Sequence, residues 1–233
     1  MRSTQNNENF EQFSVNNLVL PKVSQVRFLG LILDENLNWV QHTQQLANKL
    51  ASAYFMIKII CKYLDVSIGK LVYYALFESH LRYGIPFWGN CALINTLPIF
   101  RIQKRTLRAM YGLQSRETCR DAFSKNGILT CPSLYILETV SLVFKSISAL
   151  PTNSDFHTYP TRRGDNLRLP LPTNVTFKNS PLYIGSKLYN NLPPNLKITS
   201  SFNKFRTGVK SWLLVKSFYS VEEFLNYQSN SGI

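Results

Sequence analysis

Apolar residues recur at intervals of three and four along much of the chain, beginning near residue 40. The first segment with this spacing contains Leu46, Leu50, Ala53, Ile57 and Ile60. Such a spacing brings side chains onto one face of an α-helix. The segment therefore predicts an amphipathic helix of about six turns that ends near residues 63–65. A chain built from such helices must bury their apolar faces against one another.

Further helices are predicted on the same pattern. The second runs from Val66 to Tyr83 and is stopped by Gly84, a residue common after helix ends. The third, fourth and fifth are expected at residues 96–112, 116–125 and 132–147. Short helices are expected again at residues 181–190 and 202–218. The last of these is predicted to carry Arg206 and its other cations outward.

A small β element precedes the helices. Residues 13–20 and 26–33 have the composition of two strands, and Asp34 and Glu35 are typical of the turn that follows. The polar segment before them is predicted to be disordered. The predicted fold class is α+β, mainly α, with an N-terminal β-hairpin, a helical bundle and an irregular, partly helical C-terminal region. The corresponding ranges are 1–12 (disordered), 13–40, 41–150 and 151–233.

Positive charge dominates the chain. Lys and Arg outnumber Asp and Glu 26 to 13, which gives a formal net charge of +13 and favours polyanionic partners. The third predicted helix carries Arg101, Lys104, Arg105 and Arg108 at i, i+3, i+4 and i+7, so the four lie within about 100° of one another. No acid lies between residues 90 and 115. A phosphate backbone would neutralise this stripe, and an ordinary solvated helix face is the alternative.

Two further groups of cations extend the predicted nucleic-acid surface. Arg116 and Arg120 follow the stripe, although neighbouring acids partly offset them. Arg162, Arg163 and Arg168 surround a turn in the basic C-terminal region, where guanidinium groups can hold phosphates bidentately. A solvent-exposed turn explains the second group equally well.

No pattern in the chain is typical of a catalytic or metal site. Phosphoryl transfer to a nucleic acid needs carboxylates that converge on metal ions, and the chain has no adjacent pair of Asp. His42, His80 and His157 lack the partners of a nucleophile or a metal site, so packing or capping roles are expected. The four widely spaced cysteines predict reduced, mostly buried thiols.

The sequence also bears on location. The N-terminus has no apolar core of a signal peptide, and the longest apolar run is too short to cross a bilayer. We therefore expect an intracellular protein, nuclear or cytoplasmic, that is neither secreted nor held in a membrane.

Many short segments stand in a distinctive order. They are 26–30 with Asp34 and Trp39, 77–85, 87–89, 103–105, 116–120, 127–129, 132–135, 161–162, 180–183, 192–193 and 218–225. In this order they resemble consecutive landmarks of the reverse transcriptases of jockey-like non-LTR retrotransposons. The resemblance covers about 200 residues, although each segment alone is a weak motif.

The resemblance implies different roles for the β element and for the helices. Phe28, Leu29 and Gly30 would belong to the primer grip at the end of the polymerase palm, with the glycine allowing close backbone approach. The following helices would form a thumb that grips an RNA or DNA template–primer duplex. The family's catalytic Asp pair lies upstream of the grip, and none of the 27 residues before Phe28 matches it. The chain would then need no cofactor of its own, because Mg²⁺ would belong to the missing palm.

Two other hypotheses remain. The chain could be a degenerate relic that serves as a helical protein-interaction module through its aromatic surface. Without a palm, an apolar patch around Val26, Leu31 and Trp39 is expected to be exposed and to promote self-association. An independent enzyme is disfavoured by the missing carboxylates.

Overall fold

The computed structural model describes residues 14–16, 18–156, 164–172 and 174–230, so the segment 1–12 predicted to be disordered lies outside it. The fold class is α+β and mainly α, as predicted. The helices of the first half are α1 (Val40–Tyr63), α2 (Val66–Val72), the π-helix η1 (Tyr73–Glu78), α3 (Ser79–Arg82), α4 (Ile85–Trp88), α5 (Leu93–Tyr111) and α6 (Arg120–Lys125). Those of the second half are α7 (Cys131–Lys145), the 3₁₀ turns η2 (Ile147–Ala149) and η3 (Asn153–Asp155), α8 (Val175–Lys178), α9 (Pro181–Asn190), α10 (Pro194–Lys197), α11 (Phe202–Lys216) and α12 (Val221–Asn230).

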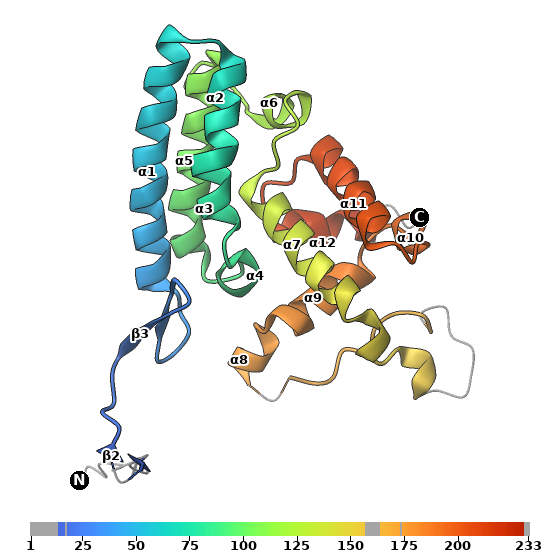
Figure 1. Ribbon diagram of the computed structural model, residues 1–233. Coiled ribbons are helices and arrows are strands. Elements are labelled where there is room, and N and C mark those ends of the chain that lie inside the picture. The colour runs from blue at the N-terminus through green and yellow to red at the C-terminus, as the bar shows by residue number, and fades with distance from the viewer. Residues whose placement is uncertain (1–13, 17, 157–163, 173, 231–233) are drawn as a thin grey trace, which may run out of the picture.

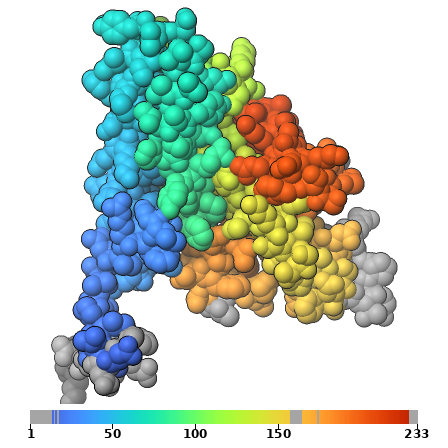
Figure 2. All heavy atoms as spheres, viewed as in Figure 1, coloured from blue at the N-terminus to red at the C-terminus, as the bar shows by residue number. Residues whose placement is uncertain are grey.

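The N-terminal β element differs from the prediction. Each segment expected to form one strand folds back as a short antiparallel hairpin. The four strands are β1 (Ser14–Val15), β2 (Leu18–Val19), β3 (Gln25–Phe28) and β4 (Leu31–Asp34). In the second hairpin Leu29 and Gly30 have φ of 45° and 81°, the left-handed conformations of a two-residue type I′ turn. Leucine rarely takes this conformation, which is why the pattern did not predict the turn. The β1–β2 hairpin lies well away from the helices (Figures 1 and 2).

The first layer of helices consists of α1, α5 and the continuous helix α2–η1–α3, which lie side by side (Figure 1). The predicted bounds of α1 are confirmed. The second helix is also confirmed, but its middle is π-helical. A π turn brings residues i and i+5 onto the same side, so Tyr73 and Glu78 both face inward and are buried. The sequence pattern did not predict that Glu78 would be buried.

The second layer is arranged around α7. This helix is apolar on nearly all sides and correspondingly buried, with α9, α11 and α12 packed against it. At Gly185 of α9 an added Cβ would lie 2.5 Å from Cγ2 of Val143, so the glycine allows α9 to approach α7 closely. Helices on both sides of the boundary predicted near Pro151 contribute to one apolar core.

The remaining predicted helices are found with shifted ends. The helix α5 begins at Leu93, three residues before expectation, and α9 has the predicted bounds. The fourth helix begins only at Arg120, because residues 114–117 form a turn. The helix α11 ends at Lys216, where Ser217 takes a left-handed φ of 46°. These differences lie at helix ends, where local sequence signals are weakest.

Two glycines form a matched pair for testing how closely the hairpin packs on the helices. Gly84 and Gly112 have φ of 63° and 66°, but an added Cβ would lie 2.7 Å from Cδ2 of Leu31 at Gly84 and within 4 Å of no described atom at Gly112. We expect Gly112→Ala to lower the free energy of unfolding by about 1 kcal/mol through left-handed strain. Gly84→Ala should cost about 1–3 kcal/mol more, through overpacking. Urea unfolding measures both, and equal losses would contradict the close contact.

Candidate nucleic-acid interface

The predicted cation stripe lies on the C-terminal half of α5. Arg101 and Arg105 are exposed, whereas Lys104 and Arg108 are half-buried. The opposite side of the helix is buried in the core, as predicted. In the described part of the chain, no carboxylate lies within 4 Å of any of these four cations. The stripe is therefore uncompensated by the protein's own acids.

Lys104 packs over two aromatic rings. Its Nζ lies 4.7 Å from the ring centroid of Phe100 and 5.4 Å from that of Tyr219, which follows α11 in the chain. Burial lowers the pKa of the Lys104 ammonium, and the positive charges of Arg108 and Arg101 lower it further. An anion at this position would relieve the repulsion among the three cations.

Arg108 and Arg105 are oriented by neighbouring groups. Nη2 of Arg108 donates to the carbonyl oxygen of Glu117 at 2.9 Å, which holds the loop after α5 against the helix and brings exposed Arg116 to the same region. The guanidinium of Arg105 lies 5.0 Å from the ring centroid of Tyr54 on α1. These contacts fix the side chains without neutralising their charge.

Arg120 stabilises the packing of α6 against the C-terminal helices. Its Nη1 lies 2.9 Å from Oε1 of Glu223 on α12 and 3.2 Å from the carbonyl oxygen of Ser217, and its guanidinium lies 4.2 Å from the Tyr219 ring centroid. Burial of Glu223 acts to raise its pKa, but the hydrogen bonds from Arg120 and from the backbone N–H of Tyr219 outweigh burial and lower the pKa. The sequence predicted a nucleic-acid contact for Arg120, and the structure shows it joining α6 to α12.

The third predicted group of cations is not brought to the stripe. Arg162 and Arg163 lie outside the described residues. Arg168 is exposed, and its guanidinium lies 3.5 Å from the ring centroid of Phe156. This loop follows the C-terminal end of α7, a helix about 22 Å long whose N-terminal end contacts α5 (Figure 1). The structure thus gathers Arg101, Lys104, Arg105 and Arg108 on α5, with exposed Arg116 in the loop that Arg108 holds, and leaves Arg168 apart.

The residues that resemble a primer grip form the β3–β4 turn. Phe28 and Leu29 are 58% and 73% exposed. The Tyr83 hydroxyl donates to the carbonyl oxygen of Leu29, and an added Cβ at Gly30 would lie 3.4 Å from the Tyr83 ring. The turn therefore rests on Tyr83 and presents Phe28 and Leu29 outward.

Of the three residues predicted to mark an exposed apolar patch near this hairpin, only Val26 is exposed. Val26 is exposed, Leu31 is half-buried beside Gly84, and Trp39 is buried in the core. The carboxylate of Asp34 explains the burial of Trp39: its Oδ2 accepts the Trp39 backbone N–H at 2.8 Å and so turns the chain inward. The turn role predicted for Asp34 is confirmed.

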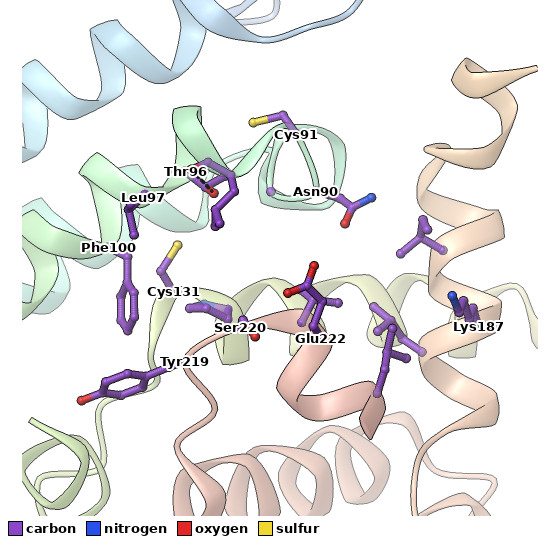
Figure 3. Close-up of a pocket in the computed structure, with 17 residues that line it drawn as sticks. Asn90, Cys91, Thr96, Leu97, Phe100, Cys131, Lys187, Tyr219, Ser220 and Glu222 are labelled. Atoms are coloured by element: carbon purple, nitrogen blue, oxygen red, sulfur yellow. Dashed lines mark hydrogen bonds between the residues drawn. The ribbon is translucent and has the colours of Figure 1, made fainter. Parts of the chain in front are cut away.

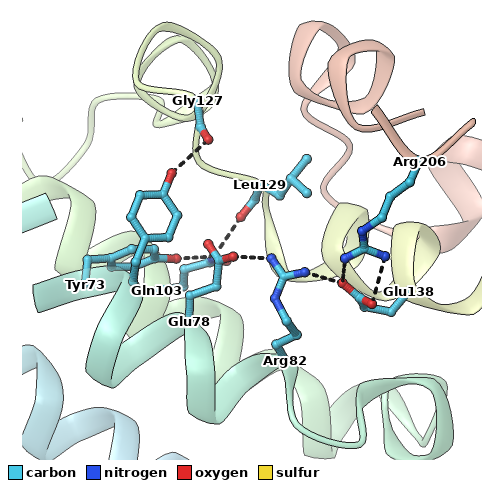
Figure 4. A network of polar contacts seen from close by, with 9 residues as sticks. Tyr73, Glu78, Arg82, Gln103, Gly127, Leu129, Glu138 and Arg206 are labelled. Atoms are coloured by element: carbon cyan, nitrogen blue, oxygen red, sulfur yellow. Dashed lines mark hydrogen bonds and ion pairs between the residues drawn. The ribbon is translucent and has the colours of Figure 1, made fainter. Parts of the chain in front are cut away.

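Sequence reasoning missed a polar cluster behind the stripe (Figure 4). Gln103 is fully buried, and its Nε2 donates to the Tyr73 hydroxyl at 2.8 Å and to the carbonyl oxygen of Leu129 at 2.9 Å. Its Oε1 accepts the backbone N–H of Cys131 at 2.7 Å. A single buried amide with all these partners fixes α5 against the start of α7. Its position between apolar residues on α5 was the only sequence signal.

An ion-pair network extends the cluster. Arg82 donates to the carboxylates of Glu78 and Glu138, and Arg206 of α11 pairs with Glu138 at 2.7 Å. Burial acts to lower the pKa of Arg82, but its bonds to Glu78 and the charge of Glu138 outweigh burial and raise it. The prediction that Arg206 points outward is wrong, because Glu138 and the Ser141 hydroxyl draw it against α7.

The histidines and cysteines show no catalytic arrangement among the described residues. His42 is buried between Trp39 and Trp88, and its Nδ1 accepts the backbone N–H of Ile32 at 3.4 Å. A ring nitrogen of His80 contacts the carbonyl oxygen of Leu76, one turn earlier in the same helix. His157 lies outside the described residues. The packing role predicted for His42 is confirmed, whereas His80 is exposed and neither packs in the core nor caps a helix end.

All four cysteines carry free thiols, of which Cys119 and Cys131 are buried and Cys61 and Cys91 half-buried. Burial raises the pKa of Cys91 to about 11 and that of Cys131 to about 12, so both thiols are protonated at neutral pH. This agrees with the predicted reduced and mostly buried thiols.

The described residues lack two further features. They contain no group of three or more His, Cys, Asp or Glu side chains placed to hold a metal ion. They also contain no helix with the length and apolar character needed to cross a membrane. Fold and site together define a mainly helical protein with an uncompensated cationic face. Comparison with protein-family models, with curated proteins and with solved structures found no match to this chain.

The network at Glu138 gives a test of stability. Its side chain is 16% exposed, and those of Arg82 and Arg206 are 35% and 29% exposed, so solvent screens the pairs only in part. We expect Glu138→Gln to lower the free energy of unfolding by about 2 kcal/mol, below the full value for a buried pair because of that exposure. Glu35→Gln, which alters an exposed pair with Lys22, should cost under about 0.5 kcal/mol. Denaturant unfolding compares the two, and similar losses would show that the network does not hold the layers together.

Proposed function

We propose that this chain is the nucleic-acid-binding, non-catalytic part of an RNA-directed DNA polymerase of the jockey-like non-LTR retrotransposon type. The cationic face formed by Arg101, Lys104, Arg105, Arg108 and Arg116 grips the phosphate backbone of a template–primer duplex. The single observation that carries this proposal is the uncompensated charge of that face. The ordered resemblance of the sequence to that family supports the same function.

The spacing of the cations suits a nucleic-acid backbone. From Arg101 to Arg108 the helix rises about 10 Å, a length over which one strand of a duplex presents about three phosphates. Lys104 is held on aromatic rings and Arg108 on backbone carbonyls, so little side-chain freedom is lost when an anion binds. Such contacts are independent of base sequence, as a polymerase requires of a duplex-gripping surface.

A second candidate function is favoured by exposed apolar residues at the far end of the first layer. Phe55 and Tyr63 in the C-terminal half of α1 are 61% and 72% exposed, and Leu71 near the end of α2 is 66% exposed. Figure 1 shows these parts of α1 and α2 at one end of the layer. A helical protein-interaction module would use this end, and Val26 and Phe28 offer a second apolar surface for self-association. Size-exclusion chromatography with and without duplex separates the two functions, because a protein-only module does not shift when duplex is added.

Charge reversal tests the proposed face. Arg101 is exposed and has no protein partner among the described residues, so Arg101→Glu should leave the fold intact. We expect it to weaken binding of a primer–template duplex about tenfold in low salt and to reduce the salt slope by about one. Lys204→Glu on α11 changes the net charge by the same amount at another exposed position and should alter affinity less than about twofold. Fluorescence anisotropy measures both affinities. Equal losses would contradict the proposed face, because they would show that only the net charge of the protein matters.

The lowered pKa of Lys104 gives a pH test. In the free protein burial and Arg108 disfavour the charged ammonium, whose ordinary pKa is 10.5. A bound phosphate favours the charged form, so binding takes up a proton at pH values between the free and bound pKa. Affinity should therefore fall at fixed salt as the pH rises through the lowered pKa of free Lys104 toward the ordinary lysine pKa of 10.5.

The Lys104→Arg variant is the matched control for this test, because arginine stays charged throughout the range. Its affinity should change less with pH than that of the unaltered chain. Parallel pH profiles for the two proteins would remove Lys104 from the proposed contact.

A further inference from the structure

A pocket of about 340 Å³ opens beside the cationic face (Figure 3). The start of α5 forms one wall, the start of α7 and the helix α9 form the others, and the first turns of α12 close it. The volume falls in the lower part of the range of small-ligand pockets, roughly 300–1,000 Å³. The pocket shares Phe100 and Tyr219 with the cationic face, because both rings also lie under Lys104.

The walls of the pocket are mainly apolar and partly aromatic. Leu97 and Phe100 line it from α5, Pro132 from α7 and Leu225 from α12. Phe100 meets Tyr219 edge to face, with 5.1 Å between the ring centroids, so the aromatic side of the pocket is rigidly built. Flat apolar walls of this kind suit the faces of a planar heterocycle, and stacking of nucleobases on aromatic side chains tolerates every base.

The polar groups in the pocket are few and face one another. Figure 3 shows the Glu222 carboxylate on α12 and the Asn90 amide on the opposite side. Neither side chain forms a hydrogen bond or ion pair with another described residue. Glu222 lies in the first turn of α12. Lys187 of α9 supplies a cation at the pocket edge.

This set of groups selects among the nucleobases. A carboxylate accepts two hydrogen bonds at once from a pair of adjacent N–H groups. Among the four common bases only guanine has such a pair on its Watson–Crick edge, namely N1–H and the N2 amino group. The Asn90 amide can donate to the neighbouring O6. Stacking faces and an edge-binding carboxylate together match guanine.

The pocket continues the cationic face along the same side of α5. Leu97 is followed by Arg101 one turn later, and Phe100 by Lys104 one turn later. Lys104 in fact lies over the Phe100 ring, at 4.7 Å from its centroid. A strand whose phosphates follow Arg101 and Lys104 therefore passes the mouth of the pocket.

We infer that the pocket receives one unstacked guanine from a single-stranded segment of the nucleic acid held on α5. The inference rests on the proposed nucleic-acid function and adds a base-reading site to it. Unpaired bases are available in a single strand or in the overhang of a template, and they can leave the stack at little cost.

Short oligonucleotides with one central base in a thymine background test the inference with the full chain. The unaltered protein should bind the strand with guanine about tenfold more tightly than strands with adenine or with inosine, which lacks the N2 amino group. Glu222→Gln should abolish this preference and leave binding of the all-thymine strand unchanged. Glu35→Gln, an exposed carboxylate at another site, should preserve the preference. Fluorescence anisotropy provides all the affinities.

The outcomes separate this inference from the proposed function. Arg101→Glu should weaken all strands equally, since phosphate contacts carry no base information. Equal binding of all strands by the unaltered protein, or a guanine preference that survives Glu222→Gln, overturns the inference of a guanine site. Either result leaves the proposed role of the cationic face unaffected. No binding of any strand or duplex overturns the proposed function as well. Binding of free guanosine monophosphate without any preference among strands also overturns the inference, because it makes the occupant a free nucleotide.

Discussion

The carboxylate of Glu138 connects the two helical layers on which the rest of the structure depends. It accepts hydrogen bonds from Arg82 of the first layer and from Arg206 of α11 in the second. The π-helical segment of the second helix brings Glu78 inward, and Glu78 holds the other side of Arg82. The π-helical segment thus completes an ion-pair network that joins the two helical layers. Breaking such a network leaves charges without partners in a partly buried site.

The position of the candidate interface follows from this arrangement. Arg206 fixes α11 against α7, and α11 leads directly into Tyr219. Tyr219 lies beneath Lys104 and Arg120, and its neighbours form one side of the pocket. The geometry of the cationic face on α5 therefore depends on a segment more than a hundred residues further along the chain. Gln103 secures the other side of α5 through its buried amide.

The helices could be predicted because their period is a local property. Apolar spacing located α1 and α9 almost to the residue, and the stripe from Arg101 to Arg108 followed from helical geometry alone. The turn at Leu29 could not be predicted, because leucine has no preference for positive φ. The role of Arg120 was equally hidden, since its partner Ser217 lies 97 residues away. Sequence pattern locates charges on an element, and only tertiary contacts decide which of them remain available to a ligand.

The division of charge within the chain supports a polyanionic partner. Several described acids are used inside the fold: Asp34 caps a turn, Glu78 and Glu138 hold arginines, and Glu223 accepts from Arg120. Acids used in this way cannot neutralise cations elsewhere. The net charge of +13 therefore leaves unpaired cations on surfaces such as the stripe on α5. The cations that pair with these acids are also different residues from those of the stripe. Binding of a phosphate backbone would therefore relieve repulsion on α5 without taking any partner from the Glu138 network, and fold stability and anion binding can vary independently.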